Sequence, residues 1–216
     1  MYSTISADII NSTSLSKSDT VIVQKRLKEF ACIVPELSEG GWGRVVKGDG
    51  FEAVLENPND ALRVALALKC YVKCFEAQSK CQEFKRYGIR IAVGIGDLRT
   101  NDPKNGIIDG EAIYASGRTI EEKTILSRGT LMISSAAGDL ELFQTLASLC
   151  ETIINDDTPK QCEVLYHKLC GVEELKVAEI LGKERSTVNE HSQKAGWPAI
   201  ERAVRYFCCS RKSRHG

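Results

Sequence analysis

The stretch from Arg44 to Leu55 is the part of the sequence that most constrains the fold. Two apolar runs flank the sequence Gly48-Asp49-Gly50, and glycines on either side of an acid are typical of a tight β-hairpin turn. Strands this close in sequence leave no room for a crossover helix, so they pair antiparallel. The hairpin therefore argues against a parallel doubly wound sheet, and it presents the carboxylate of Asp49 at an exposed tip.

A second acid, Asp8, lies in the opening apolar run from Tyr2 to Ile10. If the two strands are neighbours in one sheet, the carboxylates of Asp8 and Asp49 meet. Two carboxylates at close range raise each other's pKa unless a cation joins them, and Mg²⁺ or Mn²⁺ prefers such oxygen ligands. The pair thus predicts a divalent metal site. The same residues also allow two separately solvated acids, one in a turn and one at a strand end.

The remaining periodicity predicts an α+β fold. Helices are expected over residues 19–34, from Pro58 onward and over 111–126, strands over 87–96 and 130–133, a short strand at 107–108, and a loop over 97–106. Pro35 is expected to help end the first helix. The order of strand, helix, hairpin, helix, strand and helix suits one mainly antiparallel sheet with helices on one face, in a palm-type or ferredoxin-like arrangement.

The second half of the chain is predicted to be helical. A helix over 140–154 leads to a turn ending at Pro159, and short helices follow over 160–170, 173–181, 185–195 and 198–208. The expected division is a palm domain at 1–135, a connecting helix and linker at 136–157, and a small all-α domain at 158–216. The last part, from Lys183 to Gly216, carries eight Lys or Arg and three Asp or Glu, although the whole chain has a formal net charge of zero. This local surplus suggests a polyanionic partner.

Residues Val177 to His191 resemble the helix-turn-helix of sigma-factor region four and of LuxR-type regulators. Ala178, Ile180 and Leu181 are expected to bury the first helix against the second, and Val188 to pack into the core. Polar positions of the second helix would then face the major groove of double-stranded DNA. The predicted DNA-binding residues are Arg185, Ser186, Thr187, Asn189, Glu190, Gln193 and Lys194. The alternative is a small helical bundle used for dimerisation.

Nine cysteines occur without any Cys-x-x-Cys pair, which argues against a zinc site. The N-terminus shows no signal-peptide pattern, and no apolar run is long enough to span a bilayer. These features predict reduced thiols in a cytoplasmic protein with no membrane partner.

The first part of the chain resembles the class III nucleotidyl cyclase homology domain. The resemblance rests on Asp8-Ile9, on Gly48-Asp49 and on the segment from Gly110 to Arg118. It implies that Asp8, the carbonyl of Ile9 and Asp49 hold Mg²⁺ or Mn²⁺, and that Arg118 contacts phosphate. Two departures, Tyr114 in place of a ribose-orienting asparagine and Gly43 in place of a base-reading lysine, argue against efficient cyclisation of ATP or GTP.

A closer resemblance is to the SatD family of bacterial proteins, and it extends into the C-terminal part. It is carried by Asp8-Ile9-Ile10-Asn11-Ser12, Gly48-Asp49-Gly50-Phe51-Glu52 and Ser116-Gly117-Arg118. A nucleotide ligand is expected to meet Arg118, Gly48 and Asn11.

The predicted function is that of a cytoplasmic, homodimeric, DNA-binding transcriptional regulator. Its cyclase-like domain would be degenerate and would act as a sensor or dimerisation module. The alternative is a metal-dependent nucleotidyl cyclase or related phosphotransferase that the helical domain regulates, with Arg118 as its catalytic residue.

Overall fold

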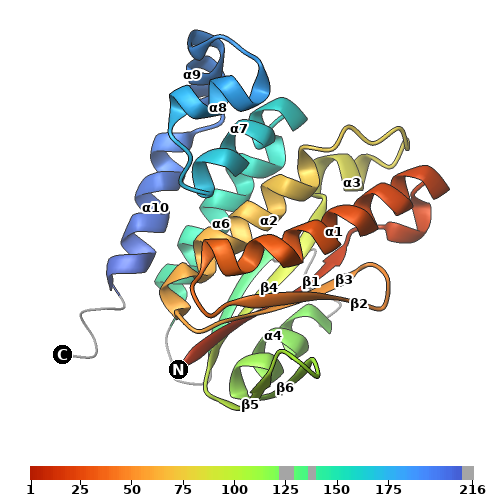
Figure 1. The fold of residues 1–216 in the computed structure, drawn as a ribbon, viewed down its shortest axis with the longest axis vertical. Helices are drawn as coiled ribbons and strands as arrows, with labels where there is room; N and C mark the ends of the chain where they lie inside the picture. Colours follow the sequence, from red (N-terminus) through yellow and green to blue (C-terminus); the bar gives the residue numbers. More distant parts are fainter. Residues whose placement is uncertain (122–128, 136–139, 211–216) are drawn as a thin grey trace.

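The computed structural model describes residues 1–121, 129–135 and 140–210 (Figure 1). The strands are β1 (Tyr2–Ile9), β2 (Trp42–Val46), β3 (Gly50–Leu55), β4 (Ile89–Gly96), β5 (Leu98–Asp102), β6 (Ile107–Gly110) and β7 (Leu131–Ser135). The helices are η1 (Ser12–Ser14), α1 (Lys17–Leu37), η2 (Pro58–Asp60), α2 (Ala61–Lys73), α3 (Gln82–Tyr87), α4 (Glu111–Glu121), α6 (Glu141–Asp156), α7 (Pro159–Leu169), α8 (Glu174–Leu181), α9 (Arg185–Lys194) and α10 (Trp197–Ser210). The α+β class predicted from the sequence is therefore confirmed.

Five strands form one sheet in the order β2-β3-β1-β4-β7, and β5 pairs with β6 in a separate hairpin. All pairs in the five-stranded sheet are antiparallel except β4 with β7. The predicted hairpin of β2 and β3 is present, but its turn is shifted by one residue. Lys47, Gly48 and Asp49 make the turn, whereas Gly50 already pairs with Val46. Lys47 and Gly48 both have positive φ, at 51° and 82°, a conformation that glycine adopts without steric cost.

Helices cover both faces of the sheet, so the expectation of helices on one face only is wrong. α1 and α2 lie on one face and α4 lies on the other (Figure 1). The physical reason is the alternation of side chains along β1. Ile5 joins the apolar core beneath α1 and α2, whereas Thr4 and Ser6 meet Ser116 of α4.

Three other expectations differ from the structure. α1 continues through Pro35, which occupies its last turn, and ends at Leu37. The segment expected as a loop over 97–106 belongs instead to the hairpin of β5 and β6. α3 was not predicted, and the expected continuation of the 111–126 helix beyond residue 121 lies outside the described residues.

The C-terminal helices pack on the sheet domain through a shared apolar core. Phe143 of α6, Leu165 of α7 and Phe207 of α10 belong to the same buried cluster as the residues of β1 and α2. A second, smaller cluster joins α7, α8 and α9 and contains Val164, Val177, Ala178 and Val188. The predicted linker at 136–157 includes the packed helix α6, and the division into domains stays a prediction. In the described part of the chain, no helix is both long and apolar enough to cross a membrane.

Candidate functional site

A cleft of about 790 Å³ lies between the polar face of the sheet and α4. Both predicted metal-binding carboxylates line it. Asp8 comes from the end of β1, and Asp49 comes from the turn that precedes β3. Asp8 pairs with Gly50 in the sheet, which places the hairpin tip beside the end of β1. The other lining residues are Ser6, Ala7, Arg44, Val46, Lys47, Gly50, Phe51, Glu52, Arg90, Gly117, Ile120 and Glu121.

Asp8 is engaged by an arginine that the sequence analysis did not identify. Arg90 lies directly opposite Asp8 in the pairing of β1 with β4. Its Nε donates to Oδ1 at 2.8 Å, and its Nη2 donates to Oδ2. The hydrogen bond to Asp8 is the main reason that the pKa of Arg90 is raised. The side chains of Arg90 and Asp8 are only 24% and 32% exposed, so the pair is partly screened from water.

Asp49 is half-buried and not exposed as the sequence predicts, because the loop that follows β1 holds it. Its Oδ2 accepts a hydrogen bond of 2.5 Å from Ser12 Oγ in η1, and its backbone carbonyl accepts one of 3.2 Å from the N–H of Ile9. These contacts fix the hairpin tip to the chain immediately after β1. Ile9 itself is 4% exposed and is not among the residues that line the cleft.

The described residues do not fit a divalent cation in this arrangement. A cation bound by Asp8 would compete with a guanidinium that already occupies both carboxylate oxygens. Moreover, the described residues include no cluster of three or more His, Cys, Asp or Glu side chains that could hold a metal ion. The predicted metal-binding residues are therefore neighbours, but one of them is neutralised from within the protein.

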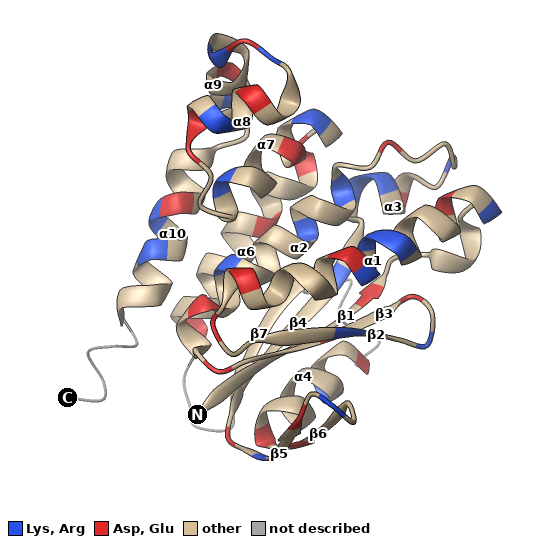
Figure 2. Ribbon diagram, in the orientation of Figure 1, with Lys and Arg blue, Asp and Glu red and all other residues tan. Residues whose placement is uncertain are grey.

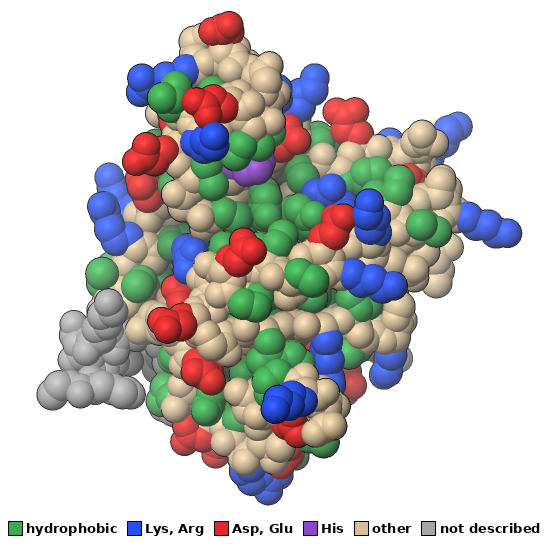
Figure 3. Space-filling model, in the orientation of Figure 1, with side chains coloured by type: hydrophobic (Ala, Val, Ile, Leu, Met, Phe, Trp, Pro, Cys, Tyr) green, Lys and Arg blue, Asp and Glu red, His purple; other side chains and the backbone are tan. Residues whose placement is uncertain are grey.

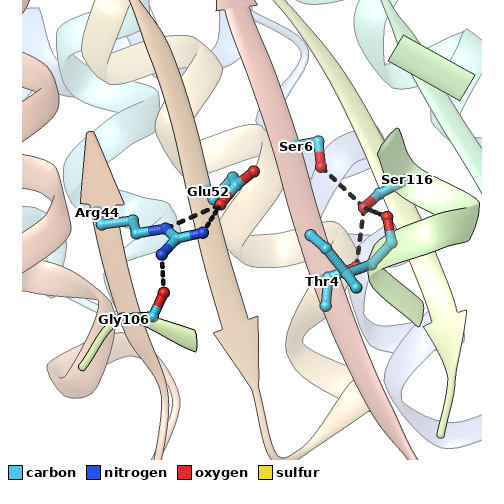
Figure 4. Close-up of polar contacts among 7 residues, drawn as sticks. Thr4, Ser6, Arg44, Glu52, Gly106 and Ser116 are labelled. Atoms are coloured by element: carbon cyan, nitrogen blue, oxygen red, sulfur yellow. Dashed lines mark hydrogen bonds and ion pairs between the residues drawn. The ribbon is translucent and has the colours of Figure 1, made fainter. Parts of the chain in front are cut away.

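A second arginine closes one side of the cleft. Arg44 of β2 donates through Nε and Nη2 to Glu52 of β3, at 2.9 and 2.5 Å. Its Nη1 reaches the carbonyl of Gly106, between β5 and β6 (Figure 4). Trp42 Nε1 also donates to Asn101 Oδ1 of β5 at 2.8 Å. These contacts fasten the small hairpin to the edge of the sheet.

Three buried hydroxyl groups join α4 to the floor of the cleft. Ser116 Oγ lies 2.9 Å from Thr4 Oγ1 and 2.8 Å from Ser6 Oγ (Figure 4). All three residues are at most 5% exposed, and mutual hydrogen bonds remove the cost of burying their hydroxyls. Gly94 of β4 permits this close packing, because a Cβ there would lie 2.0 Å from the carbonyl oxygen of Ala112.

The three residues predicted to bind a nucleotide do not line the cleft. Arg118 is exposed on α4, one residue beyond the lining residue Gly117. Gly48 lies at the hairpin turn. Asn11, which has a left-handed backbone with φ of 50°, lines a different cavity of about 350 Å³ together with Glu151.

The two departures from the cyclase pattern have local structural explanations. Tyr114 donates a hydrogen bond to Asp109 of β6 and accepts one of 3.1 Å from Arg99 of β5, so it supports the small hairpin. Hydrogen bonds from Tyr114 and then Arg99 lower the pKa of Asp109. Gly43 faces α1, because a Cβ there would lie 3.0 Å from the ring of Phe51 and 3.3 Å from Cα of Ala31. A long side chain at position 43 would therefore enter the core instead of the cleft.

The polar residues predicted to bind DNA lie at the end of the molecule farthest from β5 and β6 (Figure 1). Arg185, Ser186, Asn189, Glu190, Gln193 and Lys194 are exposed and Thr187 is half-buried. Arg185 Nε lies 3.3 Å from Glu174, and Lys194 Nζ lies 2.7 Å from Glu190. Both signs of charge occur on α8 and α9 (Figure 2), and they are interspersed over the viewed face of the molecule (Figure 3).

Packing around α8 and α9 differs from the expectation at Ile180 and, in part, at Leu181, which is only partly buried. Val177, Ala178 and Val188 are buried, but Ile180 is 50% exposed. Val177 takes the buried position instead, because it lies one helical turn before Leu181 and faces α9. Three of the eight basic residues counted from Lys183 onward, Arg211, Lys212 and Arg214, lie outside the described residues.

The chain shows similarity to known proteins at the level of structure but not of sequence. The sequence matches no protein-family profile and no curated protein. Among solved structures, it is similar to a bacterial light-regulated adenylyl cyclase, with a TM-score of 0.42 and 17% sequence identity. The alignment covers 62% of this chain and 74% of that chain. A likeness of this strength says nothing about activity.

Proposed function

We propose that the protein is a cytoplasmic bacterial DNA-binding regulator in which α8 and α9 form a helix-turn-helix. The observation that carries this proposal is the polar, solvent-facing surface of α9. Six of its seven predicted contact residues are exposed, whereas Val188 and Ser192 are buried on the opposite side. A helix that buries one side and offers a continuous polar surface is suited to the major groove.

The turn between α8 and α9 supports the same proposal. Gly182 caps α8 in the left-handed conformation, with φ of 59°, which is the usual conformation after a helix end. Only Gly182, Lys183 and Glu184 separate the two helices. A turn of this length is typical of helix-turn-helix units. Because helix-turn-helix proteins commonly bind two DNA half-sites as dimers, we also propose that the protein acts as a homodimer.

The sheet domain is proposed to be a ferredoxin-like, cyclase-type sensor of the SatD kind. The element order β1-α1-β2-β3-α2-β4 and the strand order β2-β3-β1-β4 support the ferredoxin-like part of this proposal. The cleft is large enough for a nucleotide, since small-molecule pockets span about 300–1,000 Å³. The pairing of Asp8 with Arg90 favours binding without turnover.

The second candidate is a metal-dependent nucleotidyl cyclase or phosphotransferase. It is favoured by the presence of Asp8 and Asp49 in one cleft. Incubation of the full chain with ATP or GTP and Mg²⁺ or Mn²⁺, followed by product analysis, separates the two candidates. Product that disappears in Asp49→Asn would support the enzyme and would contradict a purely regulatory role.

Single substitutions on α9 test the DNA-binding proposal. A DNA sequence that the full chain binds is first selected from genomic fragments. Binding of the full chain to this sequence is then measured by fluorescence anisotropy. Arg185→Ala is then expected to weaken binding by ~1–3 kcal/mol if the side chain reads a base. Lys194→Ala is expected to weaken binding to all sequences and to reduce the salt slope by about one, as loss of a phosphate contact does.

Lys25→Ala is the matched control for these variants. Lys25 is an exposed residue of α1 with a side chain 76% exposed, and like Lys194 it pairs with a glutamate four residues away. Its replacement removes the same charge from a surface remote from α9. Equal affinities and salt slopes for the wild type, Arg185→Ala and Lys194→Ala would show that α9 does not bind DNA.

A further inference from the structure

Arg90 engages one of the two carboxylates that the sequence predicts as metal ligands. It lies on β4, directly opposite Asp8, and it donates to both oxygens of that carboxylate. A guanidinium matches a carboxylate in this two-bonded geometry better than any other cationic side chain. The guanidinium is therefore a fixed positive charge that offsets the negative charge of Asp8 at the end of β1.

Among the residues that the structure describes, no other acid competes with Asp8 for Arg90. The described contacts of Arg90 are with Asp8 alone, whereas the other cleft arginine, Arg44, is fully committed to Glu52 and Gly106. Asp49 is the nearest second acid along the sheet, because it precedes Gly50, the partner of Asp8 in β3. Its side-chain hydrogen bond comes from the neutral hydroxyl of Ser12, and Asp49 forms no ion pair with the described residues, although Lys47 lines the same cleft.

Without Arg90, the two acids would have the character of a cation site. Asp8 and Asp49 would then lie in the same cleft, and no positive side chain of the described residues would be bound to either. Adjacent carboxylates favour a divalent ion because the ion removes their repulsion, and oxygen ligands are those that Mg²⁺ and Mn²⁺ prefer.

We propose that the Arg90 guanidinium is a built-in substitute for a divalent cation, so that the cleft works without metal and conceals a latent metal site formed by Asp8 and Asp49. The proposal concerns the cleft alone. It holds or fails independently of DNA binding by α9. It also predicts that an anionic ligand in this cleft meets a guanidinium in place of a metal ion.

Titration of the full chain with Mn²⁺, followed by electron paramagnetic resonance of the free ion, tests the proposal. The wild type is expected to show no Asp8-dependent binding up to about 1 mM, the weak end of the range for protein oxygen sites. Arg90→Met keeps a side chain of similar length without charge. It is expected to bind Mn²⁺ at least ~10-fold more tightly, equivalent to ~1.4 kcal/mol.

Three further variants make the result specific. Arg44→Met removes the other cleft arginine and is expected to bind no more Mn²⁺ than the wild type. The double variant Arg90→Met/Asp8→Asn is expected to lose the gained binding. Arg90→Gln is measured in parallel, with circular dichroism to establish folding, so that the test does not depend on one folded variant.

Two results would overturn the proposal. The first is saturable Mn²⁺ binding by the wild type that Asp8→Asn abolishes, because Arg90 would then not exclude the metal. The second is an Arg90 variant that is folded but binds no more Mn²⁺ at pH 8 than the wild type does. Asp8 and Asp49 would then form no latent metal site. Either outcome leaves the DNA-binding measurements unaffected, so failure of this proposal is distinguishable from failure of the proposed function.

Discussion

Replacement of Gly94 by alanine is expected to destabilise the protein by about 3 kcal/mol, the upper part of the range for overpacking a well-packed interior. An added Cβ would lie 2.0 Å from the carbonyl oxygen of Ala112 and 2.6 Å from the amide nitrogen of Ser116. Both contacts are with the backbone of α4, which cannot rotate away as a side chain can. The helix would have to move off the sheet, and Ser116 would lose its hydrogen bonds with Thr4 and Ser6. Chemical denaturation monitored by circular dichroism measures the change.

Gly117→Ala is the matched control for this prediction. It makes the same substitution within α4, but nothing lies within 4 Å of the added Cβ. Alanine at a helical position without strain stabilises by about 0.4–1 kcal/mol relative to glycine. A Gly94→Ala protein as stable as the wild type would show that α4 does not pack directly on β4.

Local patterns were sufficient to predict most of the secondary structure. The strand at Tyr2–Ile9 and the hairpin of β2 and β3 follow from alternation and turn residues. The start of α7 is also predictable from local sequence, because Thr158 and Gln161 form a capping box and Pro159 occupies the first helical position. Each of these features depends on residues within a few positions of one another.

The candidate site was only partly predictable, because its decisive contacts join distant parts of the chain. Asp8 and Arg90 are 82 residues apart in sequence, and their pairing depends on the register of β1 against β4. The sequence does contain a signal, since Arg90 interrupts the apolar run Ile89-Arg90-Ile91 and so marks a polar face of the strand. The sequence does not show that this polar face of β4 contacts Asp8 of β1.

The small hairpin of β5 and β6 illustrates a different reason for failure. Its sequence is rich in Asn, Asp, Pro and Gly, which favours a loop by local propensity. In the structure, Arg44 and Trp42 fasten it to the edge of β2, and Tyr114 supports it from α4. Tertiary contacts thus outweigh local preference. The same contacts involve Tyr114, one of the two residues that depart from the cyclase pattern.

The junction between the sheet and the C-terminal helices depends on a buried lysine. Lys69 of α2 is 0% exposed. Its Nζ donates to the carbonyls of Tyr87 and Ile89, at 2.9 and 3.4 Å, and to Thr130 Oγ1 at 2.8 Å. Glu151 of α6 accepts hydrogen bonds from the same Thr130. Lys69 therefore links α2 and β4 to the beginning of β7, while Glu151 links β7 to α6.

Burial should make the contribution of Lys69 to stability depend on pH. Burial lowers the pKa of Lys69 to about 7, although the nearby charge of Glu151 opposes the shift. In the unfolded chain, a lysine titrates near 10.4. Between these two values the unfolded state binds the additional proton, so the free energy of unfolding rises with pH. Below about pH 7 both states are charged, and this contribution no longer changes.

Lys69→Met is expected to remove this pH dependence. The difference in unfolding free energy between the wild type and Lys69→Met should therefore rise in favour of the wild type by ~1 kcal/mol per pH unit from about pH 7 to 8.5, close to the limit of 1.4 for one proton. Denaturation at a series of pH values measures it, and taking the difference removes the titration of other buried groups. Lys25→Met, at an exposed position of α1, provides the baseline for loss of a lysine charge. A difference for Lys69→Met as flat as that baseline would show that Lys69 keeps its proton in the folded protein, with its three acceptors holding the charged form.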